Sequence, residues 1–356
     1  MAERANTTLN GRDPRRSRRI LFWSLALLLL STMALPMTGY LVTGVNSVEA
    51  AAQQDSSSNP RSEFWRAVRG SEPGVTQVKG QETNVLIQNG GQNWREIRQG
   101  PLTTYGAIAL GVVILLIVIF QAVVGKAKLE TRTGRTVTRW SMVDRILHWY
   151  VAILFIILAI TGMATLYGRE VLIPLMGKEG FAAFAALAKP VHNYLSLFFT
   201  AGVTIMLLKW ISQNIPNSSD IKWILTGGGY FDGVHRPAGF VNGGEKMWFW
   251  ILFWGSVAMV GSGIFLLLPN LDWTRETMQL ANIIHGISSL ALIAGSIGHI
   301  YLGTIGNEGT LEGMITGEVD EAWAKQHHGL WLDEVKGESP SISGGAARPS
   351  PAAPEK

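Results

Sequence analysis

Five uncharged stretches of this 356-residue chain are long enough to cross the hydrocarbon core of a membrane. Crossing ~30 Å of hydrocarbon takes about 20 residues of apolar helix. Lipid leaves backbone polar groups no solvent partner, so each stretch must satisfy its own hydrogen bonds. We therefore predict an all-α membrane protein. The five stretches are 102–125, 146–168, 190–208, 247–271 and 277–307.

The first fifty residues resemble a targeting segment. Arginines surround Ser17, an apolar run begins at Ile20, and small residues follow near Ala50. A basic region, a short apolar region and small residues near a cut are typical of a secretory signal peptide. An uncleaved N-terminal anchor of the same orientation is the alternative. Both place residues 51–101, a segment rich in Ser, Gly, Asn and Gln, outside the cytoplasm, docked on a partner or partly disordered.

From that start, the five spans alternate in direction, the first running inward. The loop 126–145 is then cytoplasmic, and its excess of basic residues is what a cytoplasmic loop requires. We read the net charge of +4 as a topology signal and expect no nucleic-acid partner. The tail 308–356 is also predicted to be cytoplasmic. The basic residues of the loop are Lys126, Lys128, Arg132, Arg135, Arg139 and Arg145.

Histidines are the unusual polar residues of the apolar runs. An ionisable side chain in hydrocarbon is costly and is a functional candidate by default. Neutral imidazole is also an axial ligand of haem iron, and a hydrogen-bonded core histidine is the alternative for any one residue. The chain has no cysteine, which excludes iron–sulfur clusters and covalently attached haem, so any haem is b-type. The four histidines are His148, His192, His285 and His299.

Span direction pairs these histidines. His285 and His299 lie fourteen residues apart on one span, ~21 Å along a helix and on nearly the same face. His192 opens an inward-running span, level with His285 near the outer face. His148 opens an outward-running span, level with His299 near the inner face. The sequence thus predicts two bis-histidine sites, which suit electron transfer because iron keeps no open position.

Three glycines near the histidines support the haem sites, and the remaining histidines are weaker candidates for ligands. Small residues beside the ligands would let a flat macrocycle approach the helix, and ordinary close helix packing is the alternative. We expect the remaining histidines to be solvated at the surface, one in the loop between the third and fourth spans and two on a surface helix in the tail. The residues concerned are Gly286, Gly295, Gly298, His235, His327 and His328.

Several ordered stretches between residues 135 and 335 resemble the membrane cytochrome b (gamma) subunit of respiratory formate dehydrogenase. The similarity lies in their combination and order. The stretches are Asp144-Arg145-Ile146-Leu147-His148-Trp149, Lys189-Pro190-Val191-His192, Asn214-Ile215-Pro216, Asp220-Ile221, Asn242-Gly243-Gly244-Glu245-Lys246-Met247, Ile284-His285-Gly286, His299-Ile300-Tyr301, Gly313-Met314-Ile315 and Trp323-Ala324-Lys325-Gln326-His327-His328.

The resemblance implies a four-helix transmembrane bundle, residues 146–307, that holds two b haems on the four histidines. The span 102–125 is then an additional N-terminal helix. The resemblance further implies a multi-pass protein of the bacterial inner membrane. Its partners would be a molybdenum or tungsten catalytic subunit and an iron–sulfur subunit, with a higher oligomer left open.

A quinone is the electron acceptor that the resemblance implies. It would bind near the inner haem, at Asn242, Gly244, Glu245 and His299. The family leads us to expect glutamine where this chain has Glu245. A helix-starting turn with Asn242 near the cap is the alternative for this loop.

The predicted function is electron transfer from outer partner subunits, through two haems, to a quinone, with proton uptake from the cytoplasm. A di-haem cytochrome b subunit of a hydrogenase or of a thiosulfate or polysulfide reductase is the closest alternative. A haem-free transporter or scaffold is a third candidate. It would require charged companions inside the spans, and the histidine-bearing apolar runs contain none.

Overall fold

The computed structural model describes Arg66 and residues 94–231, 233–271 and 273–337. The expected targeting segment 1–50, most of the segment 51–101 and the end of the tail lie outside the described residues. The helical bundle lies between Trp94 and Gly337.

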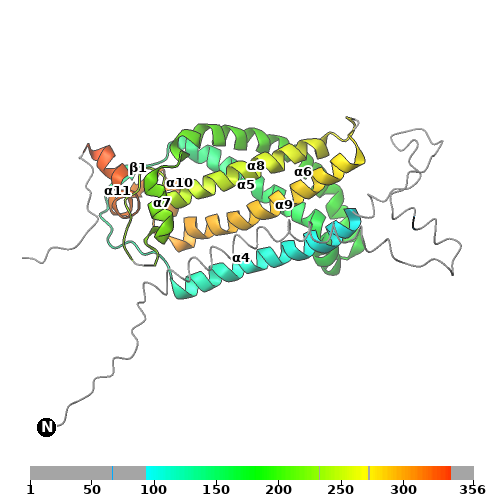
Figure 1. Cartoon of the computed structure of the whole chain (residues 1–356), viewed down its shortest axis with the longest axis horizontal. Helices are drawn as coiled ribbons and strands as arrows, with labels where there is room; N and C mark the ends of the chain where they lie inside the picture. The colour runs from blue at the N-terminus through cyan, green and yellow to red at the C-terminus, as the bar shows by residue number, and fades with distance from the viewer. Residues whose placement is uncertain (1–65, 67–93, 232, 272, 338–356) are drawn as a thin grey trace, which may run out of the picture.

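Five long helices lie side by side and form an elongated bundle (Figure 1). Short elements gather at one end, which we name the α11 end. The long helices are α4 (Thr103–Val123), α5 (Met142–Tyr167), α6 (Ile173–Trp210), α8 (Gly243–Leu267) and α9 (Arg275–Tyr301). The short elements of the α11 end are β1 (Thr136–Thr138), α7 (Ser218–Leu225), α10 (Thr310–Ile315), β2 (Glu318–Asp320) and α11 (Glu321–Lys336). The remaining helical elements of the described residues are single turns of π-helix or 3-10 helix at Arg98–Leu102, Gly168–Leu172, Ile211–Asn214, Gly227–Gly229 and Leu302–Gly306.

The long helices confirm the prediction of an all-α membrane protein. Four continuous helical stretches among the described residues are long and apolar enough to span a membrane. One of them, Met142–Asn214, contains both α5 and α6 and is 73 residues long. Each of the five expected spans therefore corresponds to one long helix.

The helices α5 and α6 run antiparallel. Trp210 near the end of α6 donates its indole N–H to Asp144 near the start of α5 (2.8 Å), and Thr161 late in α5 meets His192 earlier in α6. We expected the third span to open at Pro190, but the helix continues through this proline and breaks instead at Gly177, where φ is 76°. Glycine adopts such a left-handed conformation without the steric cost of a side chain.

The helices α8 and α9 also run antiparallel, and among the described helices they are in the most extensive contact. Leu292 of α9 lies over Gly255, and Trp248 lies over Gly295. In contrast, α4 runs parallel to α9, because Leu102 meets Gly286 at one end while Gln121 bonds to Tyr301 at the other. The additional first span is thus packed against the helix that carries two of the four histidines.

The α11 end is closed by a small folded cap. The basic loop forms β1, which pairs antiparallel with β2 in the tail, Val137 opposite Val319. Helix α11 buries Trp323 and Trp331 against this unit. The prediction that this helix lies on the surface is therefore wrong in one respect: one face of α11 is buried in a small hydrophobic core, separate from that of the bundle.

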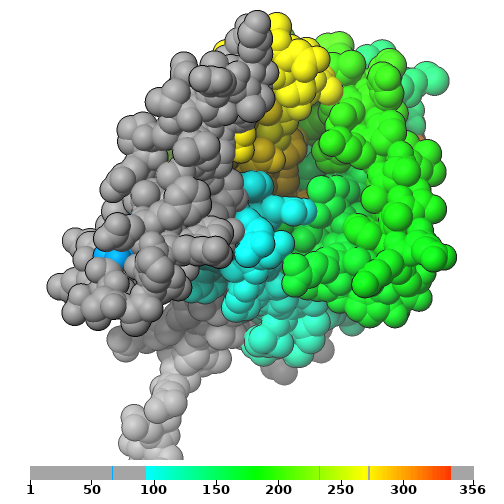
Figure 2. Space-filling view, turned by 90° about the vertical axis from the view of Figure 1, so that its right-hand side faces the viewer, coloured from blue at the N-terminus to red at the C-terminus, as the bar shows by residue number. Residues whose placement is uncertain are grey.

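The opposite end is formed by connections between the long helices. This face contains the segment around the start of α4, the turn between α5 and α6, and the α8–α9 connection (Figure 2).

Helix α5 begins at Met142, four residues before the expected start at residue 146. It begins there because the Ser141 side chain caps the helix by accepting a hydrogen bond from the backbone N–H of Asp144.

A buried ion pair attaches α7 to α8. The Lys246 ammonium donates to Asp220 (2.8 Å) and to the Ile215 carbonyl (3.1 Å), and the two charged side chains are 7% and 8% exposed. Removing one member of such a pair leaves a buried charge without its counterion, which typically costs about 3–5 kcal/mol.

We therefore expect Asp220→Asn to lower the thermal unfolding midpoint of the detergent-solubilised protein, followed by tryptophan fluorescence. Asparagine keeps an oxygen for the α7 cap, so the loss reports the charge. The double variant Asp220→Asn with Lys246→Met should recover much of the stability. Equal midpoints for the single and double variants would contradict this account.

Candidate functional site

The four predicted histidines meet in two pairs. The ring centres of His148 on α5 and His299 on α9 are 6.2 Å apart, near the α11 end. Those of His192 on α6 and His285 on α9 are also 6.2 Å apart, near the opposite end. None of the four residues is fully buried: His148, His192 and His285 are half-buried and His299 is exposed.

The ring separation fits two imidazoles on opposite sides of one metal ion. An imidazole nitrogen binds a metal at about 2.0–2.1 Å and lies roughly 1.1 Å from the centre of its ring, so two such rings have centres about 6.3 Å apart. Hydrogen-bonded rings need no such common distance. Both pairs therefore have the spacing that a bis-histidine metal requires.

Thr161 fixes the orientation of His192. Its hydroxyl donates to the carbonyl of Ile157 (2.9 Å), so its oxygen is left to accept from Nδ1–H of His192 (2.8 Å). A proton on Nδ1 leaves the lone pair of Nε2 free. Because the partner of one ring nitrogen decides which nitrogen is available to a metal, Nε2 is the nitrogen of His192 that is left for a metal.

His285 is fixed in the same way. Its Nδ1 lies 3.0 Å from the carbonyl oxygen of Met259 on α8. A carbonyl only accepts hydrogen bonds, so Nδ1 carries the proton and Nε2 is free. The two residues of this pair thus present the same nitrogen to the space between them.

Two glycines that the sequence analysis missed pack directly on these rings. A Cβ added at Gly162 would lie 3.3 Å from Cε1 of His192, and one added at Gly263 would lie 3.3 Å from Cε1 of His285. A signal for the first was present: Gly162 follows His148 by fourteen residues (162 − 148 = 14), the same spacing that separates His285 from His299.

The three glycines that the sequence suggested behave differently. Gly286 faces Leu102, at the end of the π-helical turn before α4, at 3.1 Å, and Gly295 faces Trp248 of α8, so both serve close helix packing. Gly298 has open space at its Cβ position. Helix packing, the alternative reading, therefore holds for two of the three.

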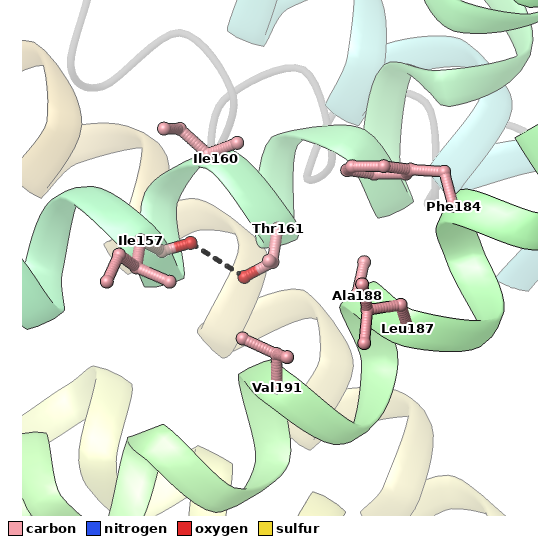
Figure 3. Close-up of a pocket in the computed structure, with 7 residues that line it drawn as sticks. All are labelled: Ile157, Ile160, Thr161, Phe184, Leu187, Ala188 and Val191. Atoms are coloured by element: carbon pink, nitrogen blue, oxygen red, sulfur yellow. Dashed lines mark hydrogen bonds between the residues drawn. The ribbon is translucent and has the colours of Figure 1, made fainter.

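An apolar groove lies beside the His192–His285 pair. It has a volume of about 180 Å³ and runs between α5 and α6, with Thr161 as its one polar side chain (Figure 3). The same threonine holds His192. The groove beside this pair is thus almost entirely apolar. The other lining residues are Ile157, Ile160, Phe184, Leu187, Ala188 and Val191.

The pair at the α11 end has different neighbours. Trp248 stacks on the ring of His299, with ring centres 5.2 Å apart and planes 14° apart. Nδ1 of His148 is buried and has no hydrogen-bond partner among the described residues. This pair is held by ring packing, whereas the other pair is held by hydrogen bonds.

Glu245, predicted to contact a quinone, lies in an ionic network. Nη2 of Arg139 donates to both of its carboxylate oxygens (2.9 and 3.2 Å), and the arginine side chain is only 3% exposed. The guanidinium also lies over the ring of Trp323, 4.7 Å from its centre. Arg139, which the sequence analysis treated only as part of a basic loop, is therefore a buried partner of this carboxylate.

Asn242 and Gly244 form the start of α8. Oδ1 of Asn242 accepts from the backbone N–H groups of Gly244 and Glu245, and Glu245 accepts from the N–H of Asn242. This reciprocal arrangement is a capping box. The alternative reading of a helix-starting turn is correct for Asn242, and its Oδ1 and the Gly244 N–H are already engaged.

The expectation of solvated tail histidines is wrong for His328. Its side chain is 1% exposed, its Nδ1 lies 2.8 Å from the Gly239 carbonyl, and its Nε2 lies 3.8 Å from Glu245. His327 is half-buried, and its Nε2 is a buried atom without a partner among the described residues. His235 is exposed, as expected, and lies 3.4 Å from Glu130. The tail folds back over the bundle, which spacing alone did not reveal.

Paired histidines inside a bundle of apolar helices define the class of this molecule, a multi-pass membrane cytochrome of b type. Residues 139–317 match the family described as prokaryotic cytochrome b561, and the chain belongs to that family. Membership implies that the protein binds haem b.

Curated relatives of the chain are cytochrome subunits of formate dehydrogenases. The cytochrome b556(Fdn) subunit of the nitrate-inducible formate dehydrogenase of Escherichia coli K12 is 25% identical, over 57% of this chain and 93% of that protein. The cytochrome b556(fdo) subunit of the same organism is 29% identical, over 56% and 94%. The formate dehydrogenase cytochrome b556 subunit of Haemophilus influenzae is 28% identical, over 58% and 87%.

The buried tail histidines make the docking of α11 sensitive to pH. Burial, then the charge of Arg139, lowers the pKa of His328 to about 3, and burial, then His235, lowers the pKa of His327 to about 4. In an undocked helix both would titrate near 6.5. Docking is then fully stable above pH 6.5 and is weakened as pH falls toward 4, by about 2 kcal/mol per histidine at pH 5.

Proteolysis within α11 should therefore accelerate between pH 7.5 and pH 5 for a protease active at both values, or amide exchange there should rise relative to α9. The double variant His327→Gln with His328→Asn should lose most of this pH dependence. An unchanged pH dependence in that variant would show that other groups control the docking.

Proposed function

We propose that the chain is the membrane cytochrome b subunit of a formate dehydrogenase complex in a bacterial inner membrane. It binds two b haems, receives electrons from iron–sulfur and catalytic partner subunits on the outer face, and passes them to a quinone near the cytoplasmic face. The names of its relatives support the choice of formate dehydrogenase.

One observation carries the proposal: two histidine pairs of equal ring separation lie at opposite ends of one bundle. The ligand residues of α9 are ~21 Å apart along the helix axis. A single core histidine with a hydrogen-bonded neighbour would not repeat at this spacing. Two sites along one helix are what a path across a membrane requires.

Haem b, which the two histidine pairs would hold, would supply one-electron redox chemistry. The chain's own residues then set the conditions. Thr161 and Met259 hold the two ligands of the outer pair by their Nδ1 atoms, which fixes Nε2 for iron. Gly162 and Gly263 leave those rings room to keep that orientation.

The orientation follows from the basic loop between α4 and α5, since basic short loops remain in the cytoplasm. His148 and His299 are then the inner ligands, and His192 and His285 the outer ones. We place the quinone beside His299 and Glu245. Asn242 and Gly244 act there by capping α8 and so presenting Glu245, because their capping groups are already bonded.

We expect two haems per chain in a pyridine haemochrome assay of the purified complex. His299→Ala should lose the inner haem and quinol formation, while dye-linked formate oxidation by the partner subunits continues, because those subunits do not depend on the inner site. One haem per wild-type chain, or normal quinone reduction by the variant, would refute the proposed route. Copurification with hydrogenase subunits would refute the choice of complex.

A matched pair of glycine variants tests the outer site without touching a ligand. Gly263→Val should push the His285 ring from its place and reduce the haem content from two to one, because a Cβ there already lies 3.3 Å from the ring. Gly261→Val, two residues away on the same helix, has nothing within 4 Å of its Cβ and should keep both haems. Equal haem content in the two variants would contradict the assignment of the outer site.

A further inference from the structure

A row of titratable side chains leads from the surface of the α11 end to Glu245. Its members come from four separate parts of the chain: the basic loop, the connection before α8, the start of α8, and α11. None of the three histidines in the row belongs to a haem-ligand pair. The row is Glu130, His235, His327, His328 and Glu245.

The inner end of the row is His328. Its Nδ1 faces the Gly239 carbonyl at 2.8 Å and so carries the proton of the neutral ring, which leaves the lone pair of Nε2 directed at the Glu245 carboxylate, 3.8 Å away. Two acceptors then face each other. A proton on Nε2 turns this contact into a charge-assisted donor–acceptor pair, so His328 can receive a proton and hand it to Glu245.

The outer end of the row reaches solvent. Nε2 of His235 lies 3.4 Å from Glu130, whose side chain is 75% exposed. The rings of His235 and His327 have centres 6.0 Å apart. Nε2 of His327 is buried and unpartnered among the described residues, so it is free to take part in a transfer. Gaps longer than 3.5 Å are distances that one bridging water spans.

The charges around the row suit transient protonation. His327 and His328 face Arg139 and Glu245, and His327 also faces His235. Burial, followed by the charge of Arg139 for His328 and by His235 for His327, keeps both rings neutral at rest, as their low pKa values indicate. Glu245 offsets the arginine charge. The described residues hold no group of three or more His, Asp or Glu arranged to bind a metal ion, so a second metal site does not explain the cluster.

We propose that His235, His327 and His328 conduct protons from the cytoplasmic surface to Glu245, which delivers them to the quinone. The inference rests on the proposed function, which supplies the quinone and its electrons. A quinone gains two electrons and two protons to become quinol. The electrons arrive through the subunit, the protons come from water at Glu130, and each histidine returns to its neutral form after every transfer.

The test uses the complex purified with its partner subunits. The haems are reduced with dithionite, excess reductant is removed, and reoxidation is followed by absorbance after mixing with menadione, which takes protons, or with ferricyanide, which takes only electrons. His328→Asn keeps a donor for the Gly239 carbonyl and removes Nε2. His327→Gln and His235→Asn remove the other two relay rings.

In the His328→Asn and His327→Gln variants we expect the haem spectrum and the ferricyanide rate to be unchanged. Reoxidation by menadione should be slower by about a hundred-fold or more, the lower end of what a positioned proton-transfer group typically contributes. The rate should fall more steeply than in the wild type as pH rises, and added imidazole should restore part of it. Lys325→Ala, an exposed site on the same helix, should behave like the wild type.

His235 is exposed, so His235→Asn tests the relay even if the substitutions at His327 and His328 prevent assembly of the complex. In this variant the rate of reoxidation by menadione should also fall, while the rate with ferricyanide stays normal. If the assembled variants show the menadione rates and pH profiles of the wild type, the proton relay is wrong and the proposed quinone reduction stands. If menadione does not reoxidise the haems of the wild-type complex, both the proposed quinone reduction and the relay are wrong.

Discussion

Hydrogen bonds that join a histidine of one helix to a polar group of the neighbouring helix hold the His192–His285 end of the bundle together. Nδ1 of His285 bonds to a backbone carbonyl of α8 and Nδ1 of His192 to a hydroxyl of α5. These bonds join neighbouring helices, and at the same time they decide which nitrogen remains free. The contacts that join the helices therefore also set which ring nitrogen faces the space between the two histidines. A loss of either bond would disturb the helix packing and the orientation of the ring together.

The two ends of the bundle provide different environments for the two histidine pairs. The His192–His285 pair lies beside an apolar groove, with hydroxyl and carbonyl groups as its polar neighbours. The His148–His299 pair lies at the α11 end, where the Glu245 carboxylate interacts with His299 and also contacts the buried guanidinium of Arg139 and the buried His328 of α11. Charges interact more strongly where water is excluded, so the cap formed by β1, β2 and α11 makes this network effective. An apolar end suits transfer of electrons alone, and a charged, capped end suits chemistry that also consumes protons.

The sequence predicted the spans and the histidine pairs because both depend on local periodicity. Apolar runs of about 20 residues and a fourteen-residue spacing are visible without tertiary information. The burial of His328 and of Arg139 was missed, because it depends on the tail folding back over the loop before α5, a contact between residues about 180 positions apart. Trp323 and Trp331, eight residues apart on one helical face, were the available signal. Pro190 led to a wrong prediction of where the third span begins, because α6 continues through this proline.

The ion pair between Arg139 and Glu245 also limits how related sequences can differ. A guanidinium that is 3% exposed needs a counterion nearby, and the Glu245 carboxylate supplies it through two hydrogen bonds from Nη2. A relative with a neutral glutamine at position 245 would leave that charge uncompensated. Positions 139 and 245 are therefore expected to covary: an acid at 245 should accompany arginine at 139, and a neutral residue at 245 should accompany a different side chain or a second acid close by.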